Sequence, residues 1–553
     1  MRKNHCRKSL WIGFAAALWT IAAAAQASSG EKATGIFNIR NYGAVGDGKT
    51  LDTAAIGRAV LACTQAGGGT VLFPAGEYVS GTFELLNNVT LNLESGAVLT
   101  GSTNLNDYGL KTDYEIDEKQ IGQSGEGLKV GIVVANKVEN IGIVGHGVIN
   151  GRGTYFVDVN TLQFSDQKDP KQLAETDGPV KPWMAWTNRP GVLVTFANCT
   201  NVLLENVTIK DAHNWTINIG KCQNVDVRGI DVLNNPLIPN NDGLDISAKN
   251  ARISNCNIWA GDDAIAADRC ENLTVANCIL SSRSSAIRFG DGRDCIFENL
   301  IIQQSNRGIA IYGAAHDILF SDIIIHTRLF NGNWWGRSEP IYISTVAHPD
   351  PTAKPAIKNI RFSNILAESE NGILIYGAEP GEIQNVSFNQ VKLRIKGSAN
   401  SETFGGKFDL SGLGFHPDKT VFKHDIPALY CQYVDGLEIH GFDLEWADNP
   451  PAYFSDGIHC EHVNNLTIDG FTGKQAQKSG SGAAIALRQV SKVSIKNCEA
   501  PEGTGTFLSL DEVKDQRLFI NNDLEQAERV SRPGQSGFIT TLGNITPALT
   551  GDK

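Results

Sequence analysis

Several residue types are scarce in this chain, and each scarcity excludes a class of protein. Only 2 of the 553 residues are methionine, which excludes a methionine-rich, adaptable binding surface. Proline, with 19 residues, is too infrequent for a collagen-like or proline-rich chain. Charged residues make up only 20% and hydrophobic residues 41%, a balance that excludes a disordered chain and predicts a packed core. After residue 27, no apolar run is long enough to span a membrane.

The first 27 residues have the features of a secretory signal peptide. Basic residues at positions 2–8 precede an apolar stretch at 9–25, and Ala25 and Ala27 fit the small-residue rule for cleavage. We therefore expect residues 1–27 to be removed. The mature protein is expected to be secreted or periplasmic, with no membrane association after cleavage.

Acidic residues outnumber basic ones. The formal net charge is −12, and it becomes −16 without the four basic residues of the leader. This balance argues against nucleic acid and against an anionic membrane surface as partners. It leaves room for a local arginine pocket that binds an acidic sugar.

Ten cysteines remain after the leader, and none forms a CxxC or a Cys/His cluster typical of a zinc site. We therefore expect no metal at the cysteines and favour buried free thiols along a core, with one or two disulfides as the alternative. Those at matching points of the repeat described next are Cys199, Cys222, Cys256, Cys278 and Cys498.

A short alternating segment that starts with Asn or Asp recurs along the chain. The central starts are separated by 23, 26, 22, 22 and 23 residues, and they are Asn201, Asn224, Asn250, Asn272, Asp294 and Asp317. Further members start at Asn88, Asn140, Asn359, Asn465 and Lys492.

This period predicts an all-β fold, a right-handed parallel β-helix with about 22–26 residues per coil. A leucine-rich repeat lacks support because its consensus is absent, and propeller units are about twice as long. The recurrent Asn suits a turn in the left-handed region, where its amide can bond to the Asn of the next coil.

We expect one catalytic domain over residues 28–533, followed by a flexible tail at 534–553. Helical spacing at 53–66 predicts a short N-terminal cap helix. The cap spans about 37–75 and the coils about 76–530, with inserted loops at about 153–190, 327–357 and 397–430.

Two acidic segments, 240–245 and 261–264, lie close to one period apart. Asp242 and Asp262 are 20 residues apart, so they should lie on the same face in adjacent coils. Crowding of carboxylates raises at least one pKa, and glycosidic cleavage needs a protonated acid beside an ionised base. Calcium binding, or solvated turn acids, is the alternative interpretation.

Three stretches and two short blocks carry a family resemblance. The stretches are 37–56, 69–76 and 207–218, and the blocks are Asn240–Gly243 and Gly261–Asp263. Together they resemble glycoside hydrolase family 28, the polygalacturonases of the pectin-lyase-like superfamily, over about residues 37–395.

The resemblance implies an exported glycosidase that acts on pectic or related polysaccharide without a metal or cofactor. It implies that Asp262 is the general acid and that Asp242 and Asp263 activate the attacking water. The family inverts the anomeric centre, for which the acid and base should lie about 6.5–9.5 Å apart. We expect a monomer.

The chain departs from the family at its cationic positions, which hold Ser285, Ala310 and Tyr312. This departure argues against plain galacturonan and favours a non-standard sugar at the cleavage subsite. Strand alternation directs Arg288 toward the cleft, in one column with Asp245, where its fork suits a carboxylate or vicinal hydroxyls. A simple Arg288–Asp245 ion pair is the alternative.

Further substrate contacts are expected from the cleft walls. Tyr312, Tyr342 and Tyr376 should form an outward row, which is either a sugar-stacking surface or an ordinary aromatic ladder. Trp335 should close the cleft wall, or else anchor its loop. The candidate substrate-binding residues are Asn240, Asp245, Ser285, Arg288, Tyr312 and Trp335.

Two other functions fit parts of the pattern. A β-helix polysaccharide lyase would bind calcium on Asp242, Asp262 and Asp263 and use Arg288 as base. A non-catalytic carbohydrate-binding β-helix would explain the missing cations. Chelator sensitivity with an unsaturated product would identify the lyase.

Overall fold

The computed structural model describes most of the chain after the predicted signal peptide. The described residues are 35–115, 129–163, 183–186, 188–330, 336–346, 356–410, 420–421, 425–477, 482–532 and 540–547. The predicted leader and cleavage site lie outside them. Among the described residues, no helix has both the length and the apolar character needed to cross a bilayer.

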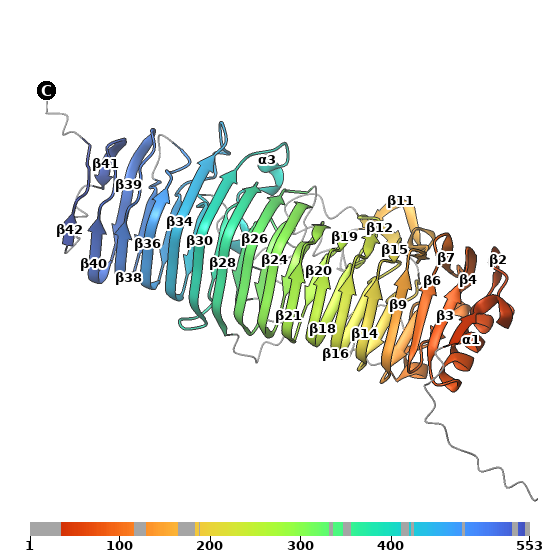
Figure 1. Ribbon diagram of the computed structural model, residues 1–553. Coiled ribbons are helices and arrows are strands. Elements are labelled where there is room, and N and C mark those ends of the chain that lie inside the picture. Colours follow the sequence, from red (N-terminus) through yellow and green to blue (C-terminus); the bar gives the residue numbers. More distant parts are fainter. Residues whose placement is uncertain are drawn as a thin grey trace, which may run out of the picture.

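The chain forms a right-handed parallel β-helix, an elongated solenoid whose coils stack along one axis (Figure 1). The fold class and the period read from the sequence are thus confirmed. Each coil contributes strands to three parallel sheets, and several strands continue around a corner from one sheet into the next.

The first sheet, called the site sheet below, is preceded in each coil by the turns that hold the acidic residues. Its strands are β5 (Phe83–Glu84), β8 (Val133–Asn136), β13 (Val194–Ala197), the first parts of β16 (Ile217–Arg228) and β18 (Leu244–Ser254), β20 (Ile265–Ala267), β23 (Ser285–Phe289), β25 (Arg307–Tyr312), β27 (Ile341–Ser344), β29 (Ile373–Tyr376), β33 (Leu429–Gln432), β35 (Ile458–Glu461), β37 (Ile485–Arg488), β39 (Thr504–Asp511) and β41 (Ala527–Ser531).

The second sheet contains the Asn-initiated repeats. It comprises β1 (Gly35–Asn38), β3 (Gly69–Phe73), β6 (Val89–Leu93), β9 (Glu139–Gly145), β14 (Thr200–Glu205), the later parts of β16 and β18, β21 (Cys270–Ala276), β24 (Gly292–Ser305), β26 (Ala315–Thr327), β28 (Ile357–Ser369), β30 (Ile383–Ile395), β34 (Val434–Trp446), β36 (Asn464–Thr472), β38 (Ser491–Lys496), β40 (Lys514–Ile520) and β42 (Thr540–Leu542).

The third sheet completes each coil. It comprises β2 (Asp47–Leu51), β4 (Gly76–Ser80), β7 (Ala97–Gly101), β10 (Val148–Asn150), β15 (Thr208–Lys210), β17 (Asp231–Leu233), β19 (Asn257–Ala260) and β22 (Ile279–Ser282), then the ends of the long strands from β24 onward.

The N-terminal end of the solenoid is covered by helix α1 (Thr53–Gln65), as the apolar spacing predicted (Figure 1). Ala55, Ile56, Ala59, Val60 and Cys63 of α1 are buried in the core. Outside the coils lie the antiparallel pair β11 (Val157–Gln163) and β12 (Trp183–Trp186), the pair β31 (Phe408–Asp409) and β32 (Thr420–Val421), and the one-turn helix α3 (Ser401–Phe404).

Asparagine side chains form a hydrogen-bonded ladder at the corner before the second sheet. Asn224 Nδ2 donates to Asn201 Oδ1 at 3.0 Å, and Asn272 Nδ2 donates to Asn250 Oδ1 at 3.0 Å. Each of these residues has a φ between 55° and 58°. Asn tolerates this left-handed backbone better than most residues, so the predicted role of the recurrent Asn is confirmed.

Stacked apolar side chains fill the interior. The rings of Phe297, Phe320, Phe362 and Phe388 stack in successive coils with centroids 4.8, 5.0 and 5.2 Å apart, close to the strand spacing. All ten cysteines between Cys63 and Cys498 are buried as free thiols, as expected.

Coil structure extends into two segments that the sequence pattern placed outside the coils. Strand β27 lies within the expected loop at 327–357 and pairs with β25 and β29. Strand β42 lies within the expected tail and pairs with β40. Both strands are only three or four residues long, too short for alternation to mark them.

Candidate active site

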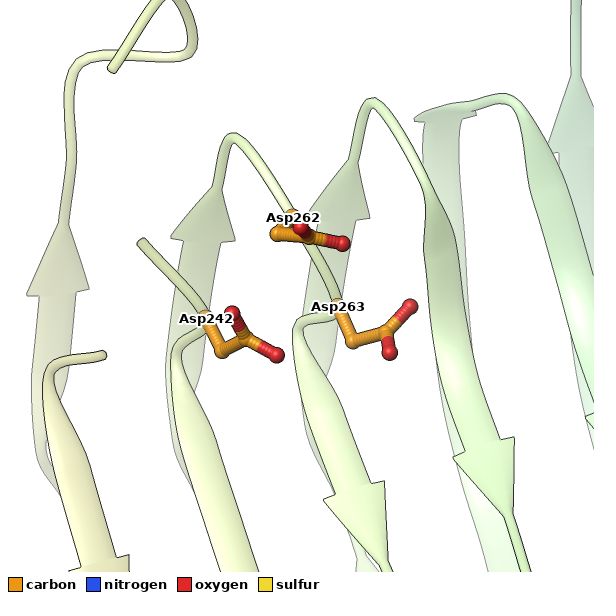
Figure 2. Close-up of side chains that lie close together, drawn as sticks. All are labelled: Asp242, Asp262 and Asp263. Carbon is orange, nitrogen blue, oxygen red and sulfur yellow. The ribbon is translucent and has the colours of Figure 1, made fainter. Parts of the chain in front are cut away.

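Three aspartates meet at the corner where the chain enters the site sheet. Asp242 precedes β18, and Asp262 and Asp263 precede β20 in the next coil (Figure 2). One carboxylate oxygen from each lies within 4.8 Å of the others. Asp242 and Asp262 are 3% exposed and Asp263 is 5% exposed. The structure therefore brings together the three residues that the two sequence blocks nominated.

Backbone hydrogen bonds stack the two acidic turns on each other. Gly243 N donates to Asp263 O at 2.8 Å, and Gly261 N donates to the side-chain oxygen of Asn241 at 2.8 Å. A Cβ on Gly261 would lie 2.4 Å from that same oxygen, so only glycine fits there. The glycines of both blocks thus permit the close approach of the coils.

The three carboxylates approach one another across one coil spacing. Their nearest oxygens lie within 4.8 Å, whereas the expected separation of about 6.5–9.5 Å applies to the acid and base carboxyl groups as wholes and stays a prediction. The reason for the close approach is the fold, because Asp242 is one coil from Asp262 and Asp263, and adjacent strands lie about 4.8 Å apart.

Hydrogen-bond donors surround Asp263. Its Oδ1 accepts from Ser284 Oγ at 2.9 Å and from Ser285 N at 3.0 Å, and its Oδ2 accepts from Arg288 Nε. All three groups donate, so the arrangement suits an ionised carboxylate. The same bonds hold the side chain in one orientation.

Asp242 and Asp245 have a different environment. Within the described residues, Asp242 Oδ1 and Asp245 Oδ2 are buried without a hydrogen-bond donor. Burial raises the pKa of Asp242 well above its ordinary value, and the neighbouring aspartates raise it further. Burial likewise raises the pKa of Asp245, against the opposing charge of Arg288. The site therefore holds two carboxyls that favour their protons beside a third, Asp263, that accepts three hydrogen bonds.

Arg288 lies between two of these carboxylates. Strand pairing places it in the predicted column, with Asp245, Ala266 and Ala310 as neighbours. Its Nη2 is 3.9 Å from Asp245 Oδ1, while its Nε binds Asp263. The expected ion pair is thus present, but its nearer partner is Asp263. The side chain remains 25% exposed.

Three further residues were candidates for substrate binding. Ser285 is 1% exposed and contacts Asp263 through its backbone N–H. Asn240 is half-buried and accepts a hydrogen bond from Arg189 at 3.4 Å. Trp335 lies outside the described residues.

The expected row of outward tyrosines does not form. Tyr312 is in register with Ser344 and Tyr376, whereas Tyr342 is in register with Ala310. Tyr312 is 6% and Tyr342 0% exposed, so neither offers a free ring face to a sugar. The reason is Arg307, whose guanidinium carbon lies 3.8 Å from the ring centroid of Tyr342 and whose Nη1 donates to the Tyr312 hydroxyl at 2.5 Å.

Sequence reasoning missed the residues that orient the acids from the neighbouring turns. Ser282 Oγ donates to the backbone oxygen of Asp262 at 2.5 Å, and Ser284 Oγ binds Asp263. The side-chain oxygen of Asn241 accepts a hydrogen bond from Gly261 N. These residues lie in turns, where the two-residue alternation that located Arg288 does not apply.

The fold and the site together define a class of protein, the parallel β-helices that carry buried carboxylates on adjacent coils. The family model described as "Glycosyl hydrolases family 28" matches residues 63–405. The chain therefore belongs to glycosyl hydrolase family 28, and both acidic blocks lie within the matched region.

Two individual relatives are 24% and 28% identical to this chain over the aligned residues. An exo-poly-alpha-D-galacturonosidase of Dickeya chrysanthemi is 28% identical over 329 residues, covering 52% of this chain and 54% of that protein. A probable polygalacturonase of Vitis vinifera is 24% identical over 362 residues, covering 60% of this chain and 68% of that one. The chain thus spans about half the length of the Dickeya protein.

Among solved structures, a family 28 exopolygalacturonase of Yersinia enterocolitica has the same fold. It aligns with a TM-score of 0.52 at 20% identity, covering 79% of this chain and 78% of that one.

Proposed function

We propose that this protein is an exported, polygalacturonase-like hydrolase that cleaves glycosidic bonds in pectic polysaccharide or oligosaccharide. The observation that carries the proposal is the cluster of Asp242, Asp262 and Asp263, with oxygens within 4.8 Å of one another, in a chain of family 28. Export rests on the leader-like residues 1–27.

In the proposed mechanism Asp262 protonates the leaving oxygen, while Asp242 and Asp263 hold and activate the attacking water. The crowded carboxylates keep a proton in the cluster near neutral pH, which supplies the acid. Asp263, fixed by its three donors, provides a stable negative charge beside the developing oxocarbenium ion. Asp263, whose oxygens face donors, can take the proton that the attacking water loses, while Asp242 holds that water.

The substituted cationic positions bear on the substrate. Ser285, Ala310 and Tyr312 are uncharged, at three positions where the family resemblance implies cations. The site therefore favours a sugar other than galacturonate at the cleavage point, within a pectic chain.

A product assay on the mature chain tests this proposal. The enzyme and its Asp262→Asn variant are incubated with pectic oligosaccharides and polysaccharides, with and without a chelator, and products are read by mass. We expect saturated products that gain one water, unaffected by chelator, and a loss of about 10²–10⁴-fold in the variant. Turnover that survives Asp262→Asn would refute the assignment of the acid.

A calcium-dependent lyase is the second candidate, because three carboxylate oxygens this close form a set that can hold a divalent cation. The contact between Arg288 Nε and Asp263 counts against it, since that arginine is then unsuited to act as the base. In the same assay, unsaturated products that disappear with chelator would favour the lyase.

A further inference from the structure

Two arginines converge on one aromatic ring at the corner that carries the aspartates. The guanidinium carbon of Arg283 lies 5.1 Å from the ring centroid of Phe330, and that of Arg328 lies 4.4 Å from it. Both are described residues outside the catalytic cluster. Arg283 is half-buried and Arg328 is exposed.

Hydrogen bonds connect this pair to the acidic turns. Arg283 lies between Ser282, which donates to Asp262 O, and Ser284, which donates to Asp263 Oδ1. On the other side, Arg328 N donates to Ser305 O, and Ser305 Oγ accepts from Ser282 N. Arg283 is therefore one turn, and Arg328 three turns, beyond Asp262 on the same corner of the solenoid.

The electrostatics of the pair favour an anion. Each guanidinium is attracted to the ring face of Phe330, but two like charges held close together repel each other. Burial, and then the charge of Arg328, lowers the pKa of Arg283 to about 10, so both remain charged at neutral pH. Within the described residues, no carboxylate lies within 4 Å of the Arg328 guanidinium.

We propose that Arg283 and Arg328, held on Phe330, form a subsite that binds the carboxylate of an acidic sugar next to the cleavage point. Guanidinium forks match a carboxylate in shape and charge, and a bound anion would relieve the repulsion between them. Ser285, Ala310 and Tyr312 provide no positive charge at the cleavage point. The subsite provides that charge at a position one or more sugars away from the cleavage point. This inference rests on the proposed function.

Matched ligands test the subsite directly. One is a pectic trisaccharide in which galacturonate alternates with rhamnose, and the other is the same trisaccharide with its carboxyls reduced to alcohols. Dissociation constants are measured for both in an Asp262→Asn background, to prevent turnover. Arg283→Gln and Arg328→Gln should each weaken binding of the acidic trisaccharide about ten-fold or more, and change binding of the reduced one by less than about two-fold.

The controls separate charge from folding. Arg361, an exposed arginine of β28 on the second sheet, serves as a matched control, and Arg361→Gln should change neither constant. Arg283→Lys should retain part of the affinity because it keeps the charge but not the fork. Because Arg328 is exposed, Arg328→Gln should fold, which a thermal melt verifies.

Either of two results would overturn the subsite: equal losses for the acidic and reduced ligands, or no binding of the acidic ligand to the parent protein. Hydrolysis by the chain with Asp262 intact decides the proposed function separately. If the chain hydrolyses its substrate but binds both trisaccharides equally, the proposed function stands and the proposed subsite is wrong.

Discussion

Arg288 Nε donates a hydrogen bond to the carboxylate of Asp263, across 25 residues of sequence and one coil of the solenoid. The pairing places a positive charge in direct contact with the acidic cluster. Burial opposes that charge, but the surrounding carboxylates outweigh it and raise the pKa of Arg288 above its ordinary value. Arg288 is therefore charged under all conditions in which the enzyme folds.

Removal of this charge should move the pH profile. Arg288 lowers the pKa values of Asp242 and Asp245, so Arg288→Met should raise both further. Because the carboxyls of the cluster interact and titrate as a group, the acidic limb of kcat/KM should move to higher pH by about one unit or more. Arg288→Lys keeps the charge, so its pH profile should stay close to that of the parent. A profile of unchanged shape in Arg288→Met would show that the arginine does not set the charge of the cluster.

Close packing at Gly261 should control the position of Asp262. In Gly261→Ala the new Cβ would meet Asn241 Oδ1 at 2.4 Å, so the turn must move. We expect kcat to fall about 10- to 100-fold, because a small misplacement of the acid is costly. Gly57→Ala is the matched control, since nothing lies within 4 Å of a Cβ there. Equal kcat in both variants would contradict this account of the turn.

Asn224 should stabilise the corner through two separable effects. Its amide donates to Asn201 and its oxygen accepts from Asn250 at 3.4 Å, and its φ is 55°. Asn224→Ala loses both bonds and strains the left-handed backbone, whereas Asn224→Gly loses only the bonds. Alanine should therefore cost about 1–2 kcal/mol more than glycine, measured by urea unfolding. The reverse order would exclude backbone strain as the cause.

His213 should make the fold sensitive to acid. It is buried between Tyr108 and Phe156, with ring centroids at 6.1 and 5.9 Å. Burial, and then the charge of Arg189, lowers its pKa to about 3. Between pH 6.5 and 3 the unfolded chain binds a proton that the folded chain does not, so stability falls as pH falls.

At pH 4.5 this difference is worth roughly 2 to 3 kcal/mol relative to neutral pH. His213→Phe should therefore lose less stability than the parent between pH 7 and pH 4.5, measured as the difference in melting temperature. The exposed His146 provides the control, and His146→Gln should behave like the parent. Equal acid sensitivity of His213→Phe and the parent would refute the prediction.

The sequence by itself determined the solenoid and the acidic cluster. The period, the alternating segments and the recurrent Asn are local properties. In a repeat protein each coil packs on its neighbours, so these local properties specify stacked coils without contacts between distant parts of the chain. For the same reason, a 20-residue offset was enough to place Asp242 beside Asp262.

Only the tertiary structure decided what the charged side chains contact. Arg288 reaches Asp263 more closely than Asp245, Arg307 buries two tyrosines, and Arg283 meets Arg328 at Phe330. Long side chains at turns and strand ends take their direction from the packing of several coils. Strand alternation gives the face on which such a residue lies, but the partner it reaches depends on the space that its neighbours leave.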